Sequence, residues 1–528
     1  MAGSSTSVDI ANAMHVAPVA IADWLVIMPS FVTIAGGAIC LMLRKNTKVQ
    51  PFVGIGFLTL LVAVNILLMA HVIQHGVITM VMGNWLPPFG IAFTVDALGA
   101  TLSLIASIVA FCAGVYGSVT VDNTNRRYGF YPFLLFLLTG VSGAFLTGDV
   151  FNLYVWFEVL LISSYGLLVL GNERPQLDGS VKYGILNLIG TNLFLISTGL
   201  IYGMFGTLNM ADLTQKIAAL DPADYGPLST IAALYLLAFA MKAAAFPVNF
   251  WLPASYHTPN IVVSAVFAGL LTKVGVYALL RIFVLLLPVA RSNMSEIIVF
   301  LAIATQIMGA LGALAQNRLN NMLGYLVIAG IGSMLGGIAV GTQHAISSTI
   351  FYAVHSILVM TGLYLVAGMM QMLNGSYELR KLGGLYVINP ALAAVFLILS
   401  LSASGLPPFS GFWAKMMLVD SAFEASHPIL AASYLISGFL TMVAIGRVWS
   451  FAFWRGGPEG TPDGKVAPAV AETSGKLPFA LWLPVLILTG IVVYTGLQPE
   501  LLMELVLRGA NGVVEPMGYL RSVFGDPS

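Results

Sequence analysis

The sequence predicts an all-α polytopic membrane protein with about fourteen transmembrane helices, and three observations support this prediction. First, 58% of the 528 residues are hydrophobic and only 8% are Asp, Glu, Lys or Arg, whereas a soluble protein carries about 25% charged residues. Second, the mean hydropathy is +0.92. Third, apolar stretches of about 20 residues, the length that crosses a hydrocarbon core, recur along the whole chain.

The same composition excludes several classes of protein. With 22 basic and 22 acidic residues, the chain has no net charge for binding a nucleic acid. Its two cysteines, Cys40 and Cys112, lie in apolar runs, which argues against a disulfide framework and a structural zinc site. The sequence has no nucleotide-binding loop, CxxC pair or metal-spaced histidine cluster, so neither a cofactor nor a metal is expected.

Each apolar stretch is expected to be a helix, because lipid offers an open strand edge no hydrogen-bond partners. The predicted spans lie near residues 22–43, 52–73, 95–117, 129–147, 150–170, 183–205, 228–252, 261–287, 296–315, 322–341, 345–373, 388–426, 427–455 and 478–498. They form four parts: spans one to three in residues 1–128, a five-helix block in 129–287, a second five-helix block in 288–455, and a cytoplasmic loop, span fourteen and a tail in 456–528.

Lysines and arginines outside the spans predict the orientation. If the N-terminus is extracytoplasmic, the cytoplasmic loops hold 13 of them: Arg44, Lys45, Lys48, Arg126, Arg127, Arg174, Lys182, Arg318, Arg380, Lys381, Arg455, Lys465 and Lys476. The opposite loops and tail hold 4: Lys216, Arg291, Arg508 and Arg521. Because cytoplasmic loops are enriched in basic residues, both termini are predicted on the extracytoplasmic side. Arg281 and Arg447 lie near span ends, where their side chains are expected to reach the interface.

Three lysines and one glutamate remain inside the predicted spans: Lys242, Lys273, Lys415 and Glu158. Lys273 lies at least 12 residues from either end of its span, or about 18 Å along a helix, and a lysine stem of about 6 Å cannot bridge that distance. Placing a charge there costs about 2.5–3.5 kcal/mol. Such residues are either ion pairs that fix helix packing, with Glu158 as a partner, or groups that load and release protons.

Proline interrupts two of the spans that carry these lysines. Pro247 follows Lys242 by five residues, and Pro407 and Pro408 precede Lys415. The span with Lys415 is 39 residues long, about 58 Å as a straight helix, whereas the hydrocarbon core is about 30 Å thick. Both spans are therefore expected to be broken at membrane depth, which is tolerated where the break lines a polar cavity.

Other titratable residues lie in or beside the spans. His355 is well inside its span, and it is either a packing residue or a relay, because an unperturbed histidine titrates near pH 6.5. His257 lies in a turn, His344 just before span eleven, and Asp149 and Asp420 near span ends. These four are candidates for the places where protons enter or leave.

The two five-helix blocks have a similar plan. In each block the fourth span carries both a proline break and a lysine. Because five is an odd number, the blocks enter the membrane from opposite faces, as inverted repeats do. Paired, proline-interrupted spans point to a transport path.

These residues resemble the antiporter-like subunits shared by respiratory complex I and the Mrp-type multisubunit sodium/proton antiporters. KAAAFPVNFWLPASYHTPNIVVSAVFAGLLTKVGVYALLR, residues 242–281, and GLPPFSGFWAK, residues 405–415, are similar to two signatures of that family. The LPASYHTPN turn is most similar to the D type of the Mrp branch. The resemblance implies a proton relay that falls here on Glu158, Lys242, Lys273, His355 and Lys415. Met360 stands near a position where the family often carries another lysine.

The resemblance implies a proton-translocating subunit, not an enzyme, that drives Na+ extrusion from a bacterial plasma membrane. Its expected partners are other membrane subunits, H+, Na+ and the lipid bilayer, and no nucleic acid. Two alternatives stay open. One is the N-type membrane subunit of complex I, and the other is a structural subunit whose lysines only fix helix packing.

Overall fold

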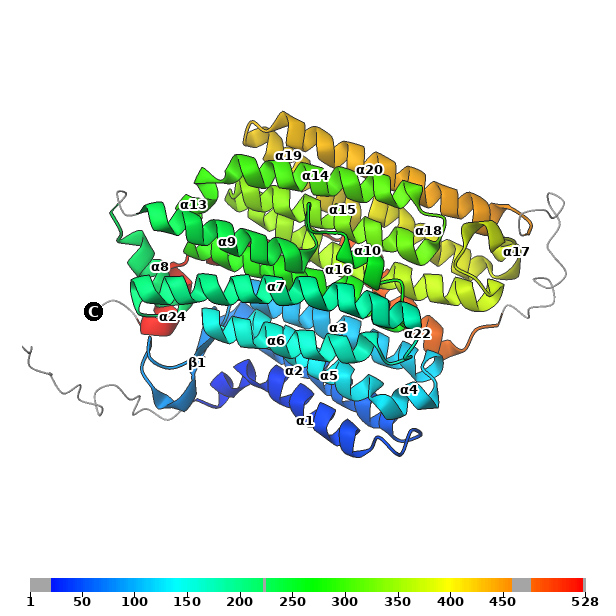
Figure 1. Ribbon diagram of the computed structural model, residues 1–528, viewed down its shortest axis with the longest axis horizontal. Helices are drawn as coiled ribbons and strands as arrows, with labels where there is room; N and C mark the ends of the chain where they lie inside the picture. Colours follow the sequence, from blue (N-terminus) through cyan, green and yellow to red (C-terminus); the bar gives the residue numbers. More distant parts are fainter. Residues whose placement is uncertain (1–19, 222–224, 458–475, 526–528) are drawn as a thin grey trace, which may run out of the picture.

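Long apolar runs form helices that lie side by side along one common direction (Figure 1). The computed structural model describes residues 20–221, 225–457 and 476–525, and 11 helices in them are long and apolar enough to cross a membrane. They are α2 (Gln50–His75), α3 (Ala97–Thr120), α6 (Val150–Leu168), α7 (Arg174–Phe205), α9 (Gly226–Ala243), the helix Ile261–Leu286, α14 (Ser295–Ala315), α15 (Leu319–Val340), α16 (Gln343–Asn374), the helix Pro428–Trp454 and α22 (Phe479–Leu497).

Three shorter apolar helices complete the bundle: α1 (Met28–Met42), α5 (Phe130–Leu146) and α18 (Pro390–Ser404). Together the long and short helices correspond one to one with the fourteen predicted spans, and the predicted helical fold class is confirmed. The helix Ile261–Leu286 contains α11 (Ile261–Val266), η5 (Phe267–Leu271), α12 (Thr272–Leu279) and η6 (Leu280–Leu286), and Pro428–Trp454 contains α20 (Pro428–Trp449) and η8 (Ser450–Trp454).

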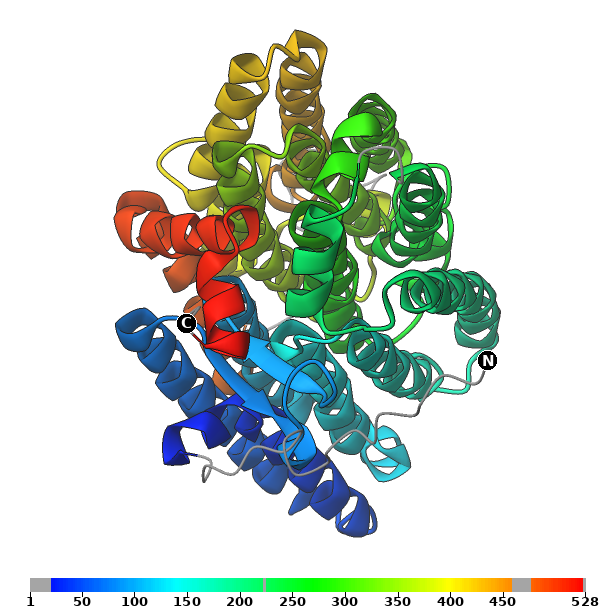
Figure 2. The ribbon, with the colours of Figure 1, turned by 90° about the vertical axis from the view of Figure 1, so that its left-hand side faces the viewer.

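One end of the bundle is covered by elements that the sequence did not predict. Strands β1 (Ile78–Val81) and β2 (Ala92–Val95) pair antiparallel, with Ile78 opposite Val95. Helices α23 (Glu500–Val514) and α24 (Met517–Phe524) occupy the segment predicted as a tail. Figure 2 shows the hairpin and these two helices lying across the ends of the long helices.

The remaining short elements connect the long helices. They are η2 (Ile21–Val26), η3 (Met82–Asn84), α4 (Asn123–Tyr128), α8 (Met210–Ala218), α10 (Trp251–Ser255), α13 (Pro288–Asn293), η7 (Leu379–Lys381) and α17 (Leu385–Ile388). Helix α19 (Ser410–Glu424) is instead the second half of the broken span that begins with α18, and it packs against α16 and α20. Most of the predicted loop between η8 and α22, residues 458–475, lies outside the described residues.

The helices α9 and α18 end in the same local structure. Ala244 follows α9 with φ 61°, and Gly405 follows α18 with φ 87°. In both turns the N–H of this left-handed residue bonds to the carbonyl three positions back, and the next N–H bonds to the carbonyl five positions back, which is a Schellman cap. Pro247 and Pro408 each follow three residues after the left-handed residue.

The most buried helices lie at the centre of the bundle. The apolar stretch of α16 is 100% buried and that of Ile261–Leu286 is 94% buried, whereas the corresponding figure for α2 and α7 is 39%. Lys273 and His355 are therefore carried by the two most buried of the long helices.

Candidate functional site

Lys242 is buried near the end of α9, with 4% of its surface exposed. Its Nζ donates to Thr191 Oγ1 on α7 at 2.7 Å and lies 5.1 Å from the centre of the Phe157 ring on α6. A cavity of about 10 Å³ adjoins Lys242, Asn187 and Tyr183. The amine is therefore surrounded by a hydroxyl, an aromatic face and very little free space.

Glu158 follows Phe157 on α6 and is only partly buried. Its carboxylate attracts Lys242, but no lysine lies within ion-pair distance of it among the described residues. Its buried Oε1 has no hydrogen-bond partner. In this structure Glu158 therefore acts on Lys242 through space, and the direct pair considered from the sequence is not formed.

Lys273 lies on α12 and is 1% exposed. Its Nζ donates to the Ala268 carbonyl at 2.6 Å, within the π-helical segment η5. Two glycines bring this helix close to its neighbours: a Cβ at Gly275 would lie 3.0 Å from the Ala243 nitrogen on α9, and Gly269 abuts Thr361 on α16. Lys273 is therefore held between the helix of Lys242 and the helix of His355.

His355 lies on α16 and is 3% exposed. Its Nδ1 lies 2.9 Å from Ser410 Oγ on α19, and Ser410 Oγ lies 3.2 Å from Ser402 Oγ on α18. Both Lys273 and Lys415 interact electrostatically with His355. The imidazole thus interacts with both lysines, and its hydrogen bond to Ser410 connects it to the second half of the broken helix.

A cavity of about 20 Å³ separates His355 from Lys415. Its polar lining also includes Tyr352, Ser356, Ser437 and Thr441. This volume holds about one water molecule, and a water needs two to four polar partners, which these side chains provide. The space between His355 and Lys415 is therefore large enough, and polar enough, for one water.

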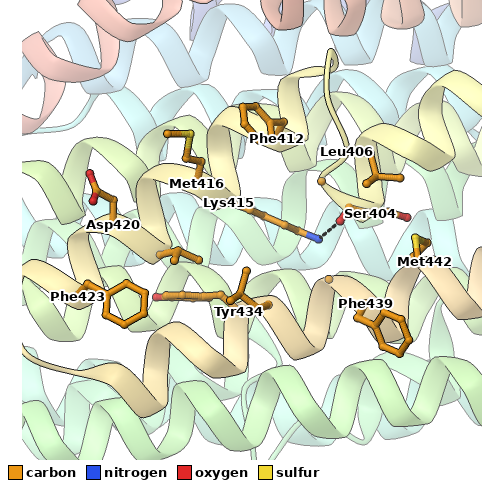
Figure 3. A pocket seen from close by; sticks show the side chains of 14 residues that line it. Ser404, Leu406, Phe412, Lys415, Met416, Asp420, Phe423, Tyr434, Phe439 and Met442 are labelled. Carbon is orange, nitrogen blue, oxygen red and sulfur yellow. Dashed lines mark hydrogen bonds between the residues drawn. The ribbon is translucent and has the colours of Figure 1, made fainter.

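Lys415 lies on α19 and caps the preceding half-helix. Its Nζ donates to the carbonyls of Ala403 at 3.0 Å and Ser404 at 2.9 Å, at the C-terminal end of α18. Figure 3 shows the amine directed at Ser404, with Asp420 and Phe423 towards the opposite end of the cavity. A positive charge is favoured there because the carbonyls at a helix C-terminus carry partial negative charge.

Lys415 also borders a second, wider cavity of about 500 Å³. Its walls are mostly apolar, and Asp420 lies at one end (Figure 3). Lys415 is the residue that lines both this cavity and the narrow one that contains His355. It is therefore placed between the interior of the bundle and the wider space. Met360 lines the narrow cavity, where a thioether cannot carry a proton.

Two residues near the span ends have shifted pKa values. Asp149 caps α6, accepting from the Asn152 N–H at 2.7 Å, and burial raises the pKa of Asp149 to about 6. His257 follows α10, and burial, together with Arg318 and Lys182, lowers its pKa below the ordinary value. Burial therefore favours the protonated carboxyl of Asp149 and the neutral imidazole of His257.

His344, Asp420 and Glu424 come together from two helices. His344 Nδ1 lies 2.9 Å from Glu424 Oε2, and the ligand atoms of all three residues lie within 4.8 Å of one another. The sequence indicated His344 and Asp420 separately and did not predict the group. We assign it no ion, because Asp420 and Glu424 are exposed.

The expectation that Arg281 reaches the membrane interface is wrong. Arg281 is 0% exposed, and its two terminal nitrogens donate to the two carboxylate oxygens of Asp96, both at 2.7 Å. Its Nε donates to Tyr277 at 2.9 Å, and the Tyr519 ring of α24 lies 5.6 Å from the guanidinium. The two charged residues are 185 positions apart, so no local sequence signal could have paired them.

Taken along the helices, these titratable groups form a series across the bundle. Glu158 lies on α6, Lys242 on α9, Lys273 on α12, His355 on α16 and Lys415 on α19. Helix α12 packs against α9, and α16 packs against both η5 and α19. Such groups can each hold a proton and, with hydroxyls or water between them, pass it on.

Comparisons with known proteins show the family and the fold of the chain. The family model described as NADH:quinone oxidoreductase/Mrp antiporter, transmembrane, matches residues 147–441. The D-type subunit of the Na+/H+ antiporter of Alkalihalophilus pseudofirmus is 37% identical over 500 residues, which cover 94% of this chain and 99% of that protein. A chain of the Mrp complex from Dietzia sp. has TM-score 0.88 and 27% identity, covering 96% of this chain and 100% of that chain. A chain of respiratory complex I from Thermus thermophilus, with TM-score 0.79 and 22% identity, shares the fold over 95% of this chain and 100% of that chain.

Proposed function

Because the chain belongs to the NADH:quinone oxidoreductase/Mrp antiporter transmembrane family, we propose that it is the proton-carrying D-type subunit of a multisubunit Na+/H+ antiporter. It is a secondary transporter subunit and not an enzyme. The observation that carries the proposal is the series of buried amines and imidazole on successive helices, because isolated buried charges are costly in a membrane and usually serve transport. The 37% identity to a D-type antiporter subunit over nearly the whole chain favours this branch over complex I.

In the proposed path, Lys242 and Lys415 are the two ends of the relay. Glu158 attracts a positive charge on Lys242, so movement of the Glu158 side chain changes how readily Lys242 holds its proton. Lys273 and His355 pass the charge through the most buried helices. Lys415 then exchanges a proton between the narrow cavity and the wider one.

We further propose that the two five-helix blocks, residues 129–287 and 288–455, are inverted repeats. The matching Schellman caps after α9 and α18 support this relation, because both precede a proline at the same spacing. The protein would lie in a bacterial plasma membrane with both termini outside. The hairpin, α23 and α24 would then cover the extracytoplasmic end, where Asp149 and Asp420 are the sites of proton exchange, and His257 would lie at the cytoplasmic end.

The test is Na+-driven proton movement in everted membrane vesicles that contain the complete complex. Lys242→Ala is expected to abolish it while the complex still assembles, as judged by co-purification of the other subunits. Lys381→Ala is the matched control, because Lys381 is an exposed lysine in a surface pair with Glu378, with side chains 66% and 39% exposed. Normal antiport in an assembled Lys242→Ala complex would contradict the relay, and loss of assembly in this variant alone would favour the structural alternative.

A further inference from the structure

The broken helix α18 presents two backbone carbonyls to the interior of the bundle. The carbonyls of Ala403 and Ser404 converge on one point, which Lys415 Nζ occupies at 3.0 and 2.9 Å. The last carbonyls of a helix have no partner within the helix, and they carry the partial negative charge of the helix C-terminus. This point is therefore a site for one positive charge, and the chain fills it with its own ammonium.

The two other buried lysines are bound differently. Lys242 donates to a side-chain hydroxyl, and Lys273 donates to one carbonyl within a continuous helix. Among these three lysines, Lys415 alone contacts two carbonyls at a helix break and borders both cavities. Unwound carbonyls and the C-terminal ends of half-helices are the groups that coordinate Na+ in other transporter folds.

The surroundings leave room for an ion in this position. Gly438 on α20 faces the site, and a Cβ there would lie 3.3 Å from both Lys415 Nζ and the Ser404 oxygen. The wider cavity of about 500 Å³ reaches the site and gives space for hydrating waters. Asp420 at its other end attracts a cation towards it (Figure 3).

We propose that Na+ and the protonated amine of Lys415 compete for the carbonyls of Ala403 and Ser404. The inference rests on the proposed function and assigns this subunit a binding site for the second ion. When Lys415 gives its proton to a water in either cavity, the neutral amine leaves the carbonyls, and Na+ takes its place. One positive charge replaces another, so the half-helix end stays neutralised in both states.

Four other titratable groups face the site. They are His355 and Tyr352 on α16, Tyr434 on α20 and Asp420 on α19 itself. A pH dependence of Na+ binding by itself therefore does not identify Lys415. A variant that removes only the charge of Lys415 does identify this residue.

The experiment is equilibrium binding of 22Na+ to the purified complex in detergent, measured between pH 6 and 10. In the wild type, Na+ affinity is expected to fall as the pH is lowered and Lys415 becomes protonated. In Lys415→Met, which keeps the length of the side chain without its charge, Na+ binding is expected to persist at low pH. An unchanged pH dependence in this variant would overturn the proposal.

Two glycines of α20 provide a matched pair of variants. Gly438→Ala places a methyl group against the Ser404 oxygen, and we expect it to weaken Na+ binding about fivefold or more. Gly446→Ala is the control, because nothing lies within 4 Å of a Cβ at Gly446. Equal Na+ affinity in the two variants would contradict the site. Binding is measured without transport, so its failure leaves the Lys242→Ala test of the proton relay intact.

Discussion

At the scale of single residues, each buried lysine is held by a different kind of partner. Lys242 donates to the Thr191 hydroxyl, and Lys273 donates to the Ala268 carbonyl. Lys415 donates to the end of α18. The hydropathy pattern predicted that these lysines lie in spans, because a charge inside an apolar stretch is visible in the sequence. Their partners could not be predicted, because they come from the packing of other helices or from a local π-helical segment.

Ser410 links His355 to the broken helix, and its removal tests that link. Ser410→Ala leaves the Nδ1 of His355 without its hydroxyl neighbour, and we expect antiport to slow about tenfold, the equivalent of about 1.4 kcal/mol and near the upper value for one neutral hydrogen bond. Ser421→Ala, on the same helix, removes only a bond to the Leu418 carbonyl and is the control. Equal rates of antiport in the two variants, measured in vesicles, would remove Ser410 from the path.

The raised pKa of Asp149 predicts that the stability of the folded protein depends on pH. Its pKa of about 6 in the folded protein exceeds the unfolded value of about 3.9. Folding therefore favours the protonated carboxyl. The contribution of this group to the free energy of unfolding is full below about pH 4, and it falls by roughly 3 kcal/mol as the pH rises through about 6.

Asp149→Asn isolates this effect, because asparagine still caps the helix but does not ionise. The wild type is expected to lose stability relative to the variant between about pH 4 and pH 6. Thermal unfolding of the purified complex at several pH values measures the difference. A difference that does not change with pH would contradict the raised pKa.

At the scale of elements, proline and hydropathy predicted the spans and their two breaks, but not the hairpin or the terminal helices. Strands β1 and β2 have 4 residues each, and a two-stranded hairpin is marginal on its own. Helices α23 and α24 carry Glu500, Glu504, Arg508, Glu515 and Arg521 in or beside them, so they do not form an apolar span. The hairpin and the two terminal helices are therefore stabilised by packing against the end of the bundle that they cover.

The two helix caps are expected to respond in opposite ways to exchange of alanine and glycine. Gly405→Ala puts a Cβ into a left-handed position against the Lys415 side chain and should cost about 1–2 kcal/mol. Ala244→Gly relieves the same strain and should stabilise by up to about 1 kcal/mol, less the entropy that glycine adds to the unfolded chain.

The melting temperature of the purified complex measures both effects. Gly446→Ala is the comparison, because Gly446 is helical with open space around it and alanine should be neutral or favourable there. A lower melting temperature for Ala244→Gly than for the wild type would contradict the expected strain at Ala244.

At the scale of the whole molecule, one buried ion pair ties the central helix to the covered end of the bundle. Asp96 begins α3 after the hairpin, Arg281 lies in the helix that carries Lys273, and Tyr519 of α24 covers the pair. The sequence could not predict this connection, because Arg281 lies close enough to a span end to be assigned to the interface. Its partner Asp96 comes from the start of α3, 185 positions earlier in the chain.

Breaking this pair is expected to be severe. Asp96→Asn leaves the Arg281 charge buried without a counter-charge, and removing one partner of a buried pair costs about 3–5 kcal/mol. Asp178→Asn breaks an exposed pair with Lys182, whose side chains are 64% and 51% exposed, and should cost about 0–1 kcal/mol. Comparable melting temperatures for the two variant complexes would show that the Asp96–Arg281 pair does not anchor the central helix.

The most direct test of the proton relay is proton uptake driven by a Na+ gradient in vesicles that contain the Lys273→Met complex. Lys273 is 1% exposed and lies between the helices of Lys242 and His355, so a path through this chain depends on it. We expect no proton uptake above that of vesicles lacking the complex, with the amount of assembled complex unchanged. Uptake at the wild-type rate would contradict a relay through Lys273.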